Sequence, residues 1–370
     1  MLQRLYVHNF RCFENFEFKI GDSHSALLIG KNGTGKSTVA KVLTVLQSIG
    51  RGTNRVGDLV SPRDFCAGRS EVPIRFEIEL SLDGRKFVYS IALELPEKFK
   101  ELRVLEERLE VDGKSVFNRN QATVALAKGA VPQADAQFSV DWHVVALSLI
   151  QTRPKDDPVH ALKSWLAHMV ILAPYPKAMS STSTDETLYP TIDGSNIGDW
   201  LTGLLSLYPA SYATIDKHLR GTMPDIKDFF NEPIGKDAKR LLVNFAAQNK
   251  KLSLSFEDLS DGEKCFFLCA VILAANSAYG PILCFWDEPD NYLSLSEVGF
   301  FVRALRSSFE SSGQLLMTSH NEEAIRAFSD ENTWVVDRKN HLEPTLIRRL
   351  DELGLQVGLI PALISGDIEL

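Results

Sequence analysis

The chain has 370 residues, of which 44% are hydrophobic and 24% are charged, and its formal net charge is −8. This balance is typical of a globular protein that buries a core in one or two domains. It argues against a chain that binds nucleic acid over its whole surface, so any DNA contact must come from a local basic patch.

The cysteines favour a reducing compartment. They are odd in number and show no CxxC spacing, which argues against a disulfide framework and predicts a cytoplasmic protein. The five are Cys12, Cys66, Cys265, Cys269 and Cys284. Cys265 and Cys269 share one face of a predicted helix, and we expect two small buried residues there in preference to a metal pair.

No segment has the properties of a membrane span. The N-terminal stretch MLQRLYVHNFRCF lacks the apolar core of a signal peptide. The apolar stretch 265–286 is interrupted by Asn276, Gly280 and Pro281. It therefore predicts a buried helix followed by a buried strand, and no contact with a membrane is expected.

The first fifty residues predict strands and then a helix. Apolar residues alternate from Leu5 to Phe18, which is typical of strands near a sheet edge. The apolar run 26–29 predicts a short buried strand. Residues 37–47 have helical apolar spacing.

A β-rich region is expected next, after the polar, loop-like residues 51–70. Alternating segments fill residues 72–95, and Asp112 and Gly113 form the turn of a second hairpin. Together they predict an antiparallel β layer inserted after the first helix.

The middle of the chain, from about residue 125 to 250, predicts mainly helices, with apolar periodicity at 162–169 and 197–207. The Ser/Thr-rich residues 180–184 predict a flexible surface loop. There are no sustained heptads, so a long coiled-coil arm is not expected.

Residues 30–37 read GKNGTGKS and fit the phosphate-loop pattern G-x-x-x-x-G-K-[ST]. Glycines let successive backbone N–H groups point at phosphate oxygens, and the following helix adds its positive end. Lys36 would reach the β- and γ-phosphates, and Ser37 would ligate Mg²⁺. The predicted nucleotide-binding residues here are Gly30, Lys31, Asn32, Gly33, Thr34, Gly35, Lys36, Ser37 and Thr38. A preceding strand and a following helix argue against a chance match.

Two carboxylates end the apolar run 281–286. A buried strand holds side chains at its tip rigidly, so Asp287 can orient Mg²⁺ and Glu288 can polarise the attacking water. Paired acids can also simply end a strand at the surface, and the phosphate loop favours the functional interpretation.

The stretch 259–264, LSDGEK, resembles the signature motif of ABC ATPases, with Asp261 in place of a glycine. The resemblance implies that Ser260 and Gly262 bind the ATP of a partner subunit, in a nucleotide-sandwiched dimer. Ser260 can equally cap a helix, with Glu263 completing a capping box. One helix start can serve both purposes.

A second apolar strand, 315–319, leads to His320. A lone histidine at a strand end is most often structural or solvated. In ABC ATPases a switch histidine at this place in the motif order contacts the γ-phosphate and the attacking water. The resemblance therefore implies a catalytic role for His320, beside Glu288 and Lys36.

The four motifs span residues 30 to 320 in the order of the ABC family. NFRCFENFEF, GKNGTGKST and DEPDNYLS look like the RecF, SMC and OLD-type ATPases, and DGSNIGDWL with LSDGEK is similar to compact AAA-type ATPases of bacterial anti-phage defence. The chain departs from that pattern. No Q-loop glutamine is evident, and Leu293 is followed by Ser294 where many relatives have Asp or His. Arg51 or Arg55 is a candidate basic loop residue. The residues after His320 are too few for a TOPRIM nuclease.

The expected fold is α/β, a P-loop NTPase of the ABC-ATPase-head type, with a mixed sheet, an antiparallel β layer and a helical lobe. We expect a nucleotide-binding lobe from residues 1–70 and 250–350, a β insertion at 71–125, a helical lobe at 126–249 and a tail at 351–370. The resemblance implies an ATPase that uses ATP and Mg²⁺ and switches by dimerising around ATP. It would be the sensor subunit of a defence complex with a separately encoded nuclease or toxin. The alternative is a RecF-like repair ATPase that binds DNA.

Overall fold

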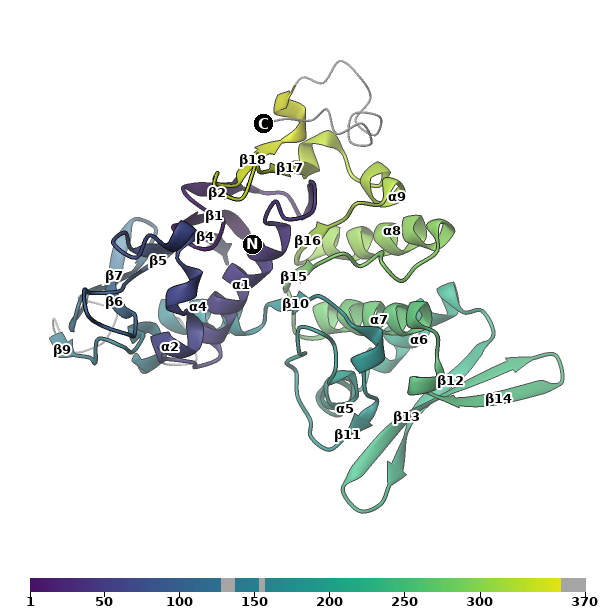
Figure 1. The fold of residues 1–370 in the computed structure, drawn as a ribbon. Coiled ribbons are helices and arrows are strands. Elements are labelled where there is room, and N and C mark those ends of the chain that lie inside the picture. Colours follow the sequence, from purple (N-terminus) through teal and green to yellow (C-terminus); the bar gives the residue numbers. More distant parts are fainter. Residues whose placement is uncertain (128–136, 153–156, 354–370) are drawn as a thin grey trace. The chain divides into compact units, whose positions relative to one another are not determined.

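The computed structural model describes residues 1–127, 137–152 and 157–353. The chain divides into two compact units, and Figure 1 colours its elements in sequence order. Unit 1 consists of residues 1–23, 28–169 and 330–370, and unit 2 consists of residues 24–27 and 170–329. The end of the predicted tail, from residue 354, lies outside the described residues.

Unit 1 contains an eight-stranded antiparallel sheet in the order β2-β1-β4-β5-β6-β7-β8-β9. Its strands are β1 Leu2–His8, β2 Phe16–Lys19, β4 Ile74–Leu82, β5 Arg85–Glu94, β6 Arg103–Val111, β7 Lys114–Asn120, β8 Thr123–Leu126 and β9 Gln137–Ser139. Alternate residues of β4 are buried, as a sheet with one covered face requires. The predicted β layer is confirmed, but it also includes β1 and β2, which precede the first helix.

The helices of unit 1 are α1 Lys36–Gly50, α2 Val56–Leu59, α3 Ala146–Leu149 and α4 Pro158–Ala167. The helix predicted from residue 37 is confirmed as α1, which packs against α4. Gly50 allows this close approach, because a Cβ atom there would lie 2.5 Å from Cβ of Leu166. The predicted loop 51–70 contains α2, a short helix that periodicity cannot detect.

Unit 2 has a core of parallel strands, β10 Val170–Leu172, β15 Leu283–Trp286 and β16 Gln314–Thr318. The strand β3 Ser25–Ile29 passes from unit 2 to unit 1, and unit 1 also holds the antiparallel pair β17 Thr333–Asp337 and β18 Leu346–Arg349. Every residue of β15 and β16 is buried. Such continuous apolar runs are typical of parallel strands covered on both faces.

The helices of unit 2 are α5 Ile197–Leu207, α6 Ser211–Thr222, α7 Asp261–Tyr279, α8 Leu295–Ser311 and α9 Glu322–Arg326. The helices predicted at 197–207 and between 265 and 280 are confirmed as α5 and α7. α7 contacts α5, α6 and α8, and residues 264–276 are all buried. Cys265 and Cys269 lie in this core as predicted. None of the described helices is long and apolar enough to cross a membrane.

A third, antiparallel sheet in unit 2 was not predicted. Its strands are β11 Thr182–Ser183, β12 Ile226–Ile234, β13 Ala238–Ala247 and β14 Lys250–Ser255. In Figure 1 the β12–β14 ribbon extends away from α5, α6 and α7. Residues 180–184, predicted as a flexible surface loop, are partly buried. They are tied to the segment before α7, where Glu257 accepts hydrogen bonds from N and Oγ of Ser181 at 2.7 and 2.8 Å.

A buried carboxylate connects the sheet of unit 1 to the start of α3. Glu107 is fully buried on β6 and accepts hydrogen bonds from the backbone N–H groups of Ala146 and Leu147, each at 2.7 Å. The hydroxyl of Tyr89 donates to it at 3.1 Å, and Arg119 lies 3.7 Å away. Burial raises the pKa of the Glu107 carboxyl, while these donors favour its charged form.

We expect Glu107→Ala to lower the free energy of unfolding by about 3–5 kcal/mol, because the change leaves buried donors without their acceptor and the buried Arg119 guanidinium without its opposite charge. The neighbouring Glu106 forms an exposed ion pair with Arg75 at 3.1 Å. Glu106→Ala is therefore the matched control, with an expected loss below about 1 kcal/mol. Denaturant titration of both variants measures the difference, and equal losses would contradict this account.

Candidate functional site

The phosphate loop of unit 1 needs glycine at three positions. Gly30, Gly33 and Gly35 have φ angles of 153°, 81° and 110°, in the region that side chains disfavour. A Cβ atom at Gly30 would lie 2.0 Å from the carbonyl oxygen of Val336. At Gly35 it would lie 2.8 Å from Sγ of Cys12. The loop is thus packed tightly at both ends, whereas Gly33 has open space around it.

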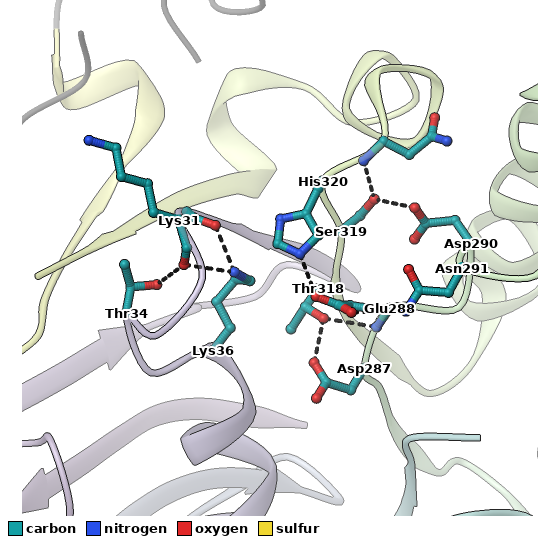
Figure 2. Close-up of polar contacts among 12 residues, drawn as sticks. Lys31, Thr34, Lys36, Asp287, Glu288, Asp290, Asn291, Thr318, Ser319 and His320 are labelled. Atoms are coloured by element: carbon teal, nitrogen blue, oxygen red, sulfur yellow. Dashed lines mark hydrogen bonds and ion pairs between the residues drawn. The ribbon is translucent and has the colours of Figure 1, made fainter. Parts of the chain in front are cut away.

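Hydrogen bonds within unit 1 fix the shape of this loop. Lys36 is buried and its Nζ donates to the carbonyl oxygens of Gly30 and Lys31 at 2.6 and 3.1 Å, as Figure 2 shows. The hydroxyl of Thr34 donates to the carbonyl oxygen of Lys31 at 2.9 Å, and Thr345 donates to the carbonyl oxygen of Thr34. The loop surrounds the lysine amine.

The start of α1 suits an anion. Its N-cap is Gly35, no side chain caps its N-terminal N–H groups, and its first turn contains no acidic residue. Asp157, Ser260 and Asn321 cap α4, α7 and α9 with their side chains, whereas α5 and α6 begin, like α1, without a side-chain cap. A helix N-terminus carries a partial positive charge and needs acceptors, which a phosphate supplies. Asn32 and Ser37 are exposed on the loop, and Thr38 follows in the first turn.

In unit 2, the predicted acids and histidine come together at one sheet edge. β15 and β16 are parallel neighbours with Trp286 opposite Met317, so their carboxyl ends share that edge. Asp287 follows β15, and its backbone N–H donates to the carbonyl oxygen of Leu172 at 2.7 Å. His320 follows β16, two residues after its end.

Glu288 is held in an unusual conformation. Its φ angle is 48°, a left-handed value that is uncommon for a residue with a side chain. Nε2 of His320 contacts Oε1 of its carboxylate, and Nδ2 of Asn291 donates to Oε2 at 2.9 Å. Figure 2 shows these groups converging on the carboxylate. Strain of this kind concentrates at functional sites.

Asp290 and Ser319 form a second buried contact at this edge. The Ser319 hydroxyl donates to Oδ2 of Asp290 at 3.0 Å and accepts the backbone N–H of Asn321 at 2.9 Å. Oδ1 of Asp290 is buried without a hydrogen-bond partner among the described residues. Burial raises the pKa of the Asp290 carboxyl, and the Ser319 hydrogen bond opposes this shift.

The signature-like turn forms a capping box at the start of α7. The Ser260 hydroxyl donates to Oε2 of Glu263 at 2.7 Å, and the backbone N–H groups of Ser260 and Glu263 complete the box. The predicted cap is thereby confirmed. A Cβ atom at Gly262 would lie 3.1 Å from the carbonyl oxygen of Tyr292, so the turn packs closely on the segment after β15.

Three residues whose roles the sequence left open, Arg51, Arg55 and Ser294, have partners in the structure. Arg55 pairs with Glu101 at 2.9 Å, and Arg51 donates to the carbonyl oxygen of Ala167 at 3.1 Å. Ser294, where relatives often have Asp or His, is the N-cap of α8 and forms a capping box with Glu297.

Sequence reasoning gave no role to Thr318, Ser319, Asp290 or Asn291. The available signal was weak: two hydroxyl residues interrupt an otherwise apolar strand just before His320, and polar residues follow Glu288. The partners of Thr318 and Ser319 lie 31 and 29 residues away, so only the pairing of β15 with β16 reveals these two contacts, whereas Asn291 contacts Glu288 within its own loop.

Comparison with protein families matches residues 25–326 to the family described as "AAA domain, putative AbiEii toxin, Type IV TA system". A curated relative is the energy-coupling factor transporter ATP-binding protein EcfA of Malacoplasma penetrans (strain HF-2). It is 29% identical over 125 residues, which cover 30% of this chain and 44% of that protein. The match thus spans less than half of that relative's length.

Solved structures share the fold at low sequence identity. The Smc head bound to the C-winged helix domain of ScpA matches with a TM-score of 0.58 and 13% identity, over 95% of this chain and 99% of that chain. An Smc head with an extended coiled coil, bound to the C-terminal domain of ScpA derived from Pyrococcus furiosus, gives 0.56 and 12% identity, over 99% of each chain. The predicted fold class is confirmed: the chain is a mixed α/β P-loop NTPase that resembles SMC and ABC ATPase heads.

We expect Lys36→Ala to weaken ATP binding by about 10–100-fold, because each hydrogen bond to a charged group contributes about 1.5–3 kcal/mol. Lys41→Ala is the matched control, since it removes an exposed lysine of α1 that lies outside the predicted nucleotide-binding residues. Equilibrium titration with a fluorescent ATP analogue measures both. Equal losses in the two variants would show that net positive charge, and not the buried amine, holds the nucleotide.

Proposed function

We propose that this chain, a member of the AAA-domain family of AbiEii type, hydrolyses ATP and uses ATP to switch between a monomer and a nucleotide-sandwiched dimer. The observation that carries the proposal is the start of α1, where a tightly packed glycine loop leaves the helix N-terminus without a side-chain cap. That arrangement suits a phosphate chain.

The residues present fit Mg²⁺ as a partner of the nucleotide. Magnesium prefers oxygen ligands and is usually held by one or two carboxylates together with substrate phosphates. Ser37 and Asp287 supply a hydroxyl and a partly exposed carboxylate of that kind. No group of three or more His, Cys, Asp or Glu residues within the described ranges could hold a metal alone, which agrees with a metal that arrives with ATP. The ion would neutralise charge on the phosphates.

The chain's own side chains supply the remaining chemistry. Lys36 binds the β- and γ-phosphates, Glu288 orients and polarises the attacking water, and His320 holds the Glu288 carboxylate and contacts the γ-phosphate. Phosphoryl transfer needs positioning and charge stabilisation more than covalent catalysis. The hydrogen bonds from His320 and Asn291 to Glu288 support this assignment, because they fix the carboxylate at a strand end.

Dimerisation follows from the signature-like turn. Under the proposal, Ser260 and Gly262 of one copy bind the ATP held by the phosphate loop of the other. ATP would then bind the closed dimer preferentially, and hydrolysis would open it. The start of α7 supports this role, since Ser260 is exposed and its hydroxyl is hydrogen-bonded to its own capping partner Glu263.

For the biological role we propose a regulatory ATPase in cellular defence that acts with a separately encoded effector. The family description names a toxin of a toxin–antitoxin system, which supports the presence of a functional partner. The net charge of −8 favours this role over RecF-like DNA binding.

We expect the chain to co-purify with the product of an adjacent gene when the two are expressed together, and the contact to depend on ATP. Affinity purification with and without ATP tests this. Duplex DNA binding that weakens with salt, in the absence of any protein partner, would favour the repair ATPase instead.

We expect Glu288→Gln to lower kcat for ATP hydrolysis by 100-fold or more, about the contribution of a general base, and to accumulate an ATP-bound dimer. Steady-state phosphate release measures the rate, and light scattering measures the dimer. Glu310→Gln, the same change at an exposed carboxylate of α8, is the control. Hydrolysis at the parental rate in Glu288→Gln would refute the assignment.

Adding Ser260→Ala to Glu288→Gln tests dimerisation separately from ATP binding at the phosphate loop. We expect the double variant to bind ATP and remain monomeric. Asp157→Ala removes a comparable N-cap from α4 and costs about 1 kcal/mol of stability, so adding it instead should leave the dimer intact. A dimer that persists without the Ser260 hydroxyl would contradict the sandwich.

A further inference from the structure

We propose that Thr318 is the positioning residue for both acids of the site: its single hydroxyl fixes the Asp287 carboxylate and the backbone of Glu288 together. This inference rests on the proposed ATPase function, and it deepens the assignment of the two acids. Thr318 ends β16 and is fully buried.

The hydroxyl uses both of its hydrogen-bonding capacities. Oγ1 of Thr318 donates to Oδ1 of Asp287 at 2.5 Å and accepts the backbone N–H of Glu288 at 2.9 Å (Figure 2). A hydroxyl carries one donor and acceptor lone pairs, so one oxygen can hold two consecutive residues of the facing loop. Thr318 thus contacts both acids at once.

The contact matters most for Glu288, because this residue has a left-handed backbone at φ 48°. Such a conformation is strained and persists only where surrounding contacts enforce it. The Thr318 hydroxyl accepts the N–H of this strained residue. Loss of the hydroxyl frees the backbone to relax, which turns the carboxylate away from His320.

The neighbouring contacts show that the segments after β15 and β16 are joined at several positions. Ser319 bonds to Asp290 and His320 to Glu288, so each of the three residues 318–320 contacts the segment 287–290. Ser319 and His320 each contact one side chain of that segment. Thr318 differs because both of its partners, the Asp287 side chain and the Glu288 backbone N–H, lie in that segment.

The test compares Thr318→Val with Thr318→Ser in the full chain. Valine keeps the shape and removes the hydroxyl, whereas serine keeps the hydroxyl. We expect Thr318→Val to lower kcat on the order of 100-fold, as misplacement of reacting groups by about 1 Å does. Thr318→Ser should restore most of the rate. If valine prevents folding, Thr318→Ala replaces it.

Thr202→Val is the matched control in the same unit. Thr202 lies on α5, outside the proposed site, and its buried hydroxyl accepts a hydrogen bond from Asn231 at 3.0 Å. Both valine variants should lower the thermal unfolding midpoint, but Thr202→Val should keep the parental kcat. Equal effects on kcat would mean that Thr318 acts only through stability, and the inference would fail.

Two further measurements do not depend on hydrolysis. Calorimetric titration with ADP, with Mg²⁺ and with EDTA, should show that Thr318→Val loses the gain in affinity that Mg²⁺ gives, while affinity in EDTA is unchanged. Crystal structures of the variants should show Glu288 leaving the left-handed region in Thr318→Val and keeping it in Thr318→Ser.

The outcomes separate the two proposals. A left-handed Glu288 in Thr318→Val with an unchanged Mg²⁺ dependence overturns the positioning role, whatever the ATPase rate. If the parental chain hydrolyses no ATP but Glu288 is displaced in Thr318→Val, the proposed function is overturned and the positioning role stands.

Discussion

The parallel pairing of β15 with β16 is the constraint on which the chemistry of unit 2 depends. With Trp286 opposite Met317, the next residues of both strands emerge at one edge of the sheet. Every residue of the two strands is buried, so neither can shift without exposing apolar side chains. The carboxylates and the Thr-Ser-His segment are therefore held together by the core, at fixed register, before any ligand binds.

The N-termini of α1 and α7, which carry the phosphate loop and the signature-like turn, differ in how their backbone N–H groups are satisfied. α1 begins at a glycine, and no side chain among the described residues caps its N-terminal N–H groups. α7 begins with a complete capping box, in which Glu263 satisfies the N–H and hydroxyl of Ser260. Under the proposed function, the loop at α1 is ready for phosphate, whereas a phosphate at α7 must replace an internal carboxylate.

Local patterns predicted those parts of the fold that local physics controls. The phosphate loop is a short contiguous segment whose glycines and lysine serve one purpose, and its strand and helix neighbours have clear apolar periods. The buried strand before Asp287 and the helix at 197–207 were predictable for the same reason. The β12–β14 ribbon, residues 226–255, was not predictable from the sequence, because apolar and polar residues alternate only weakly along its strands and many of them are exposed. Its strands are stabilised mainly by pairing with one another.

Sequence patterns alone were enough to identify the fold class and the residue types of the candidate site: a phosphate loop, two acids at a strand end and a histidine after a second strand. How those residues are held in place follows from the tertiary structure. Thr318 and Asp287 are separated by 31 positions, and their hydrogen bond exists because two distant strands pair in parallel. A hydroxyl at a strand end has no periodicity of its own, so its role depends entirely on what the neighbouring strand places opposite it.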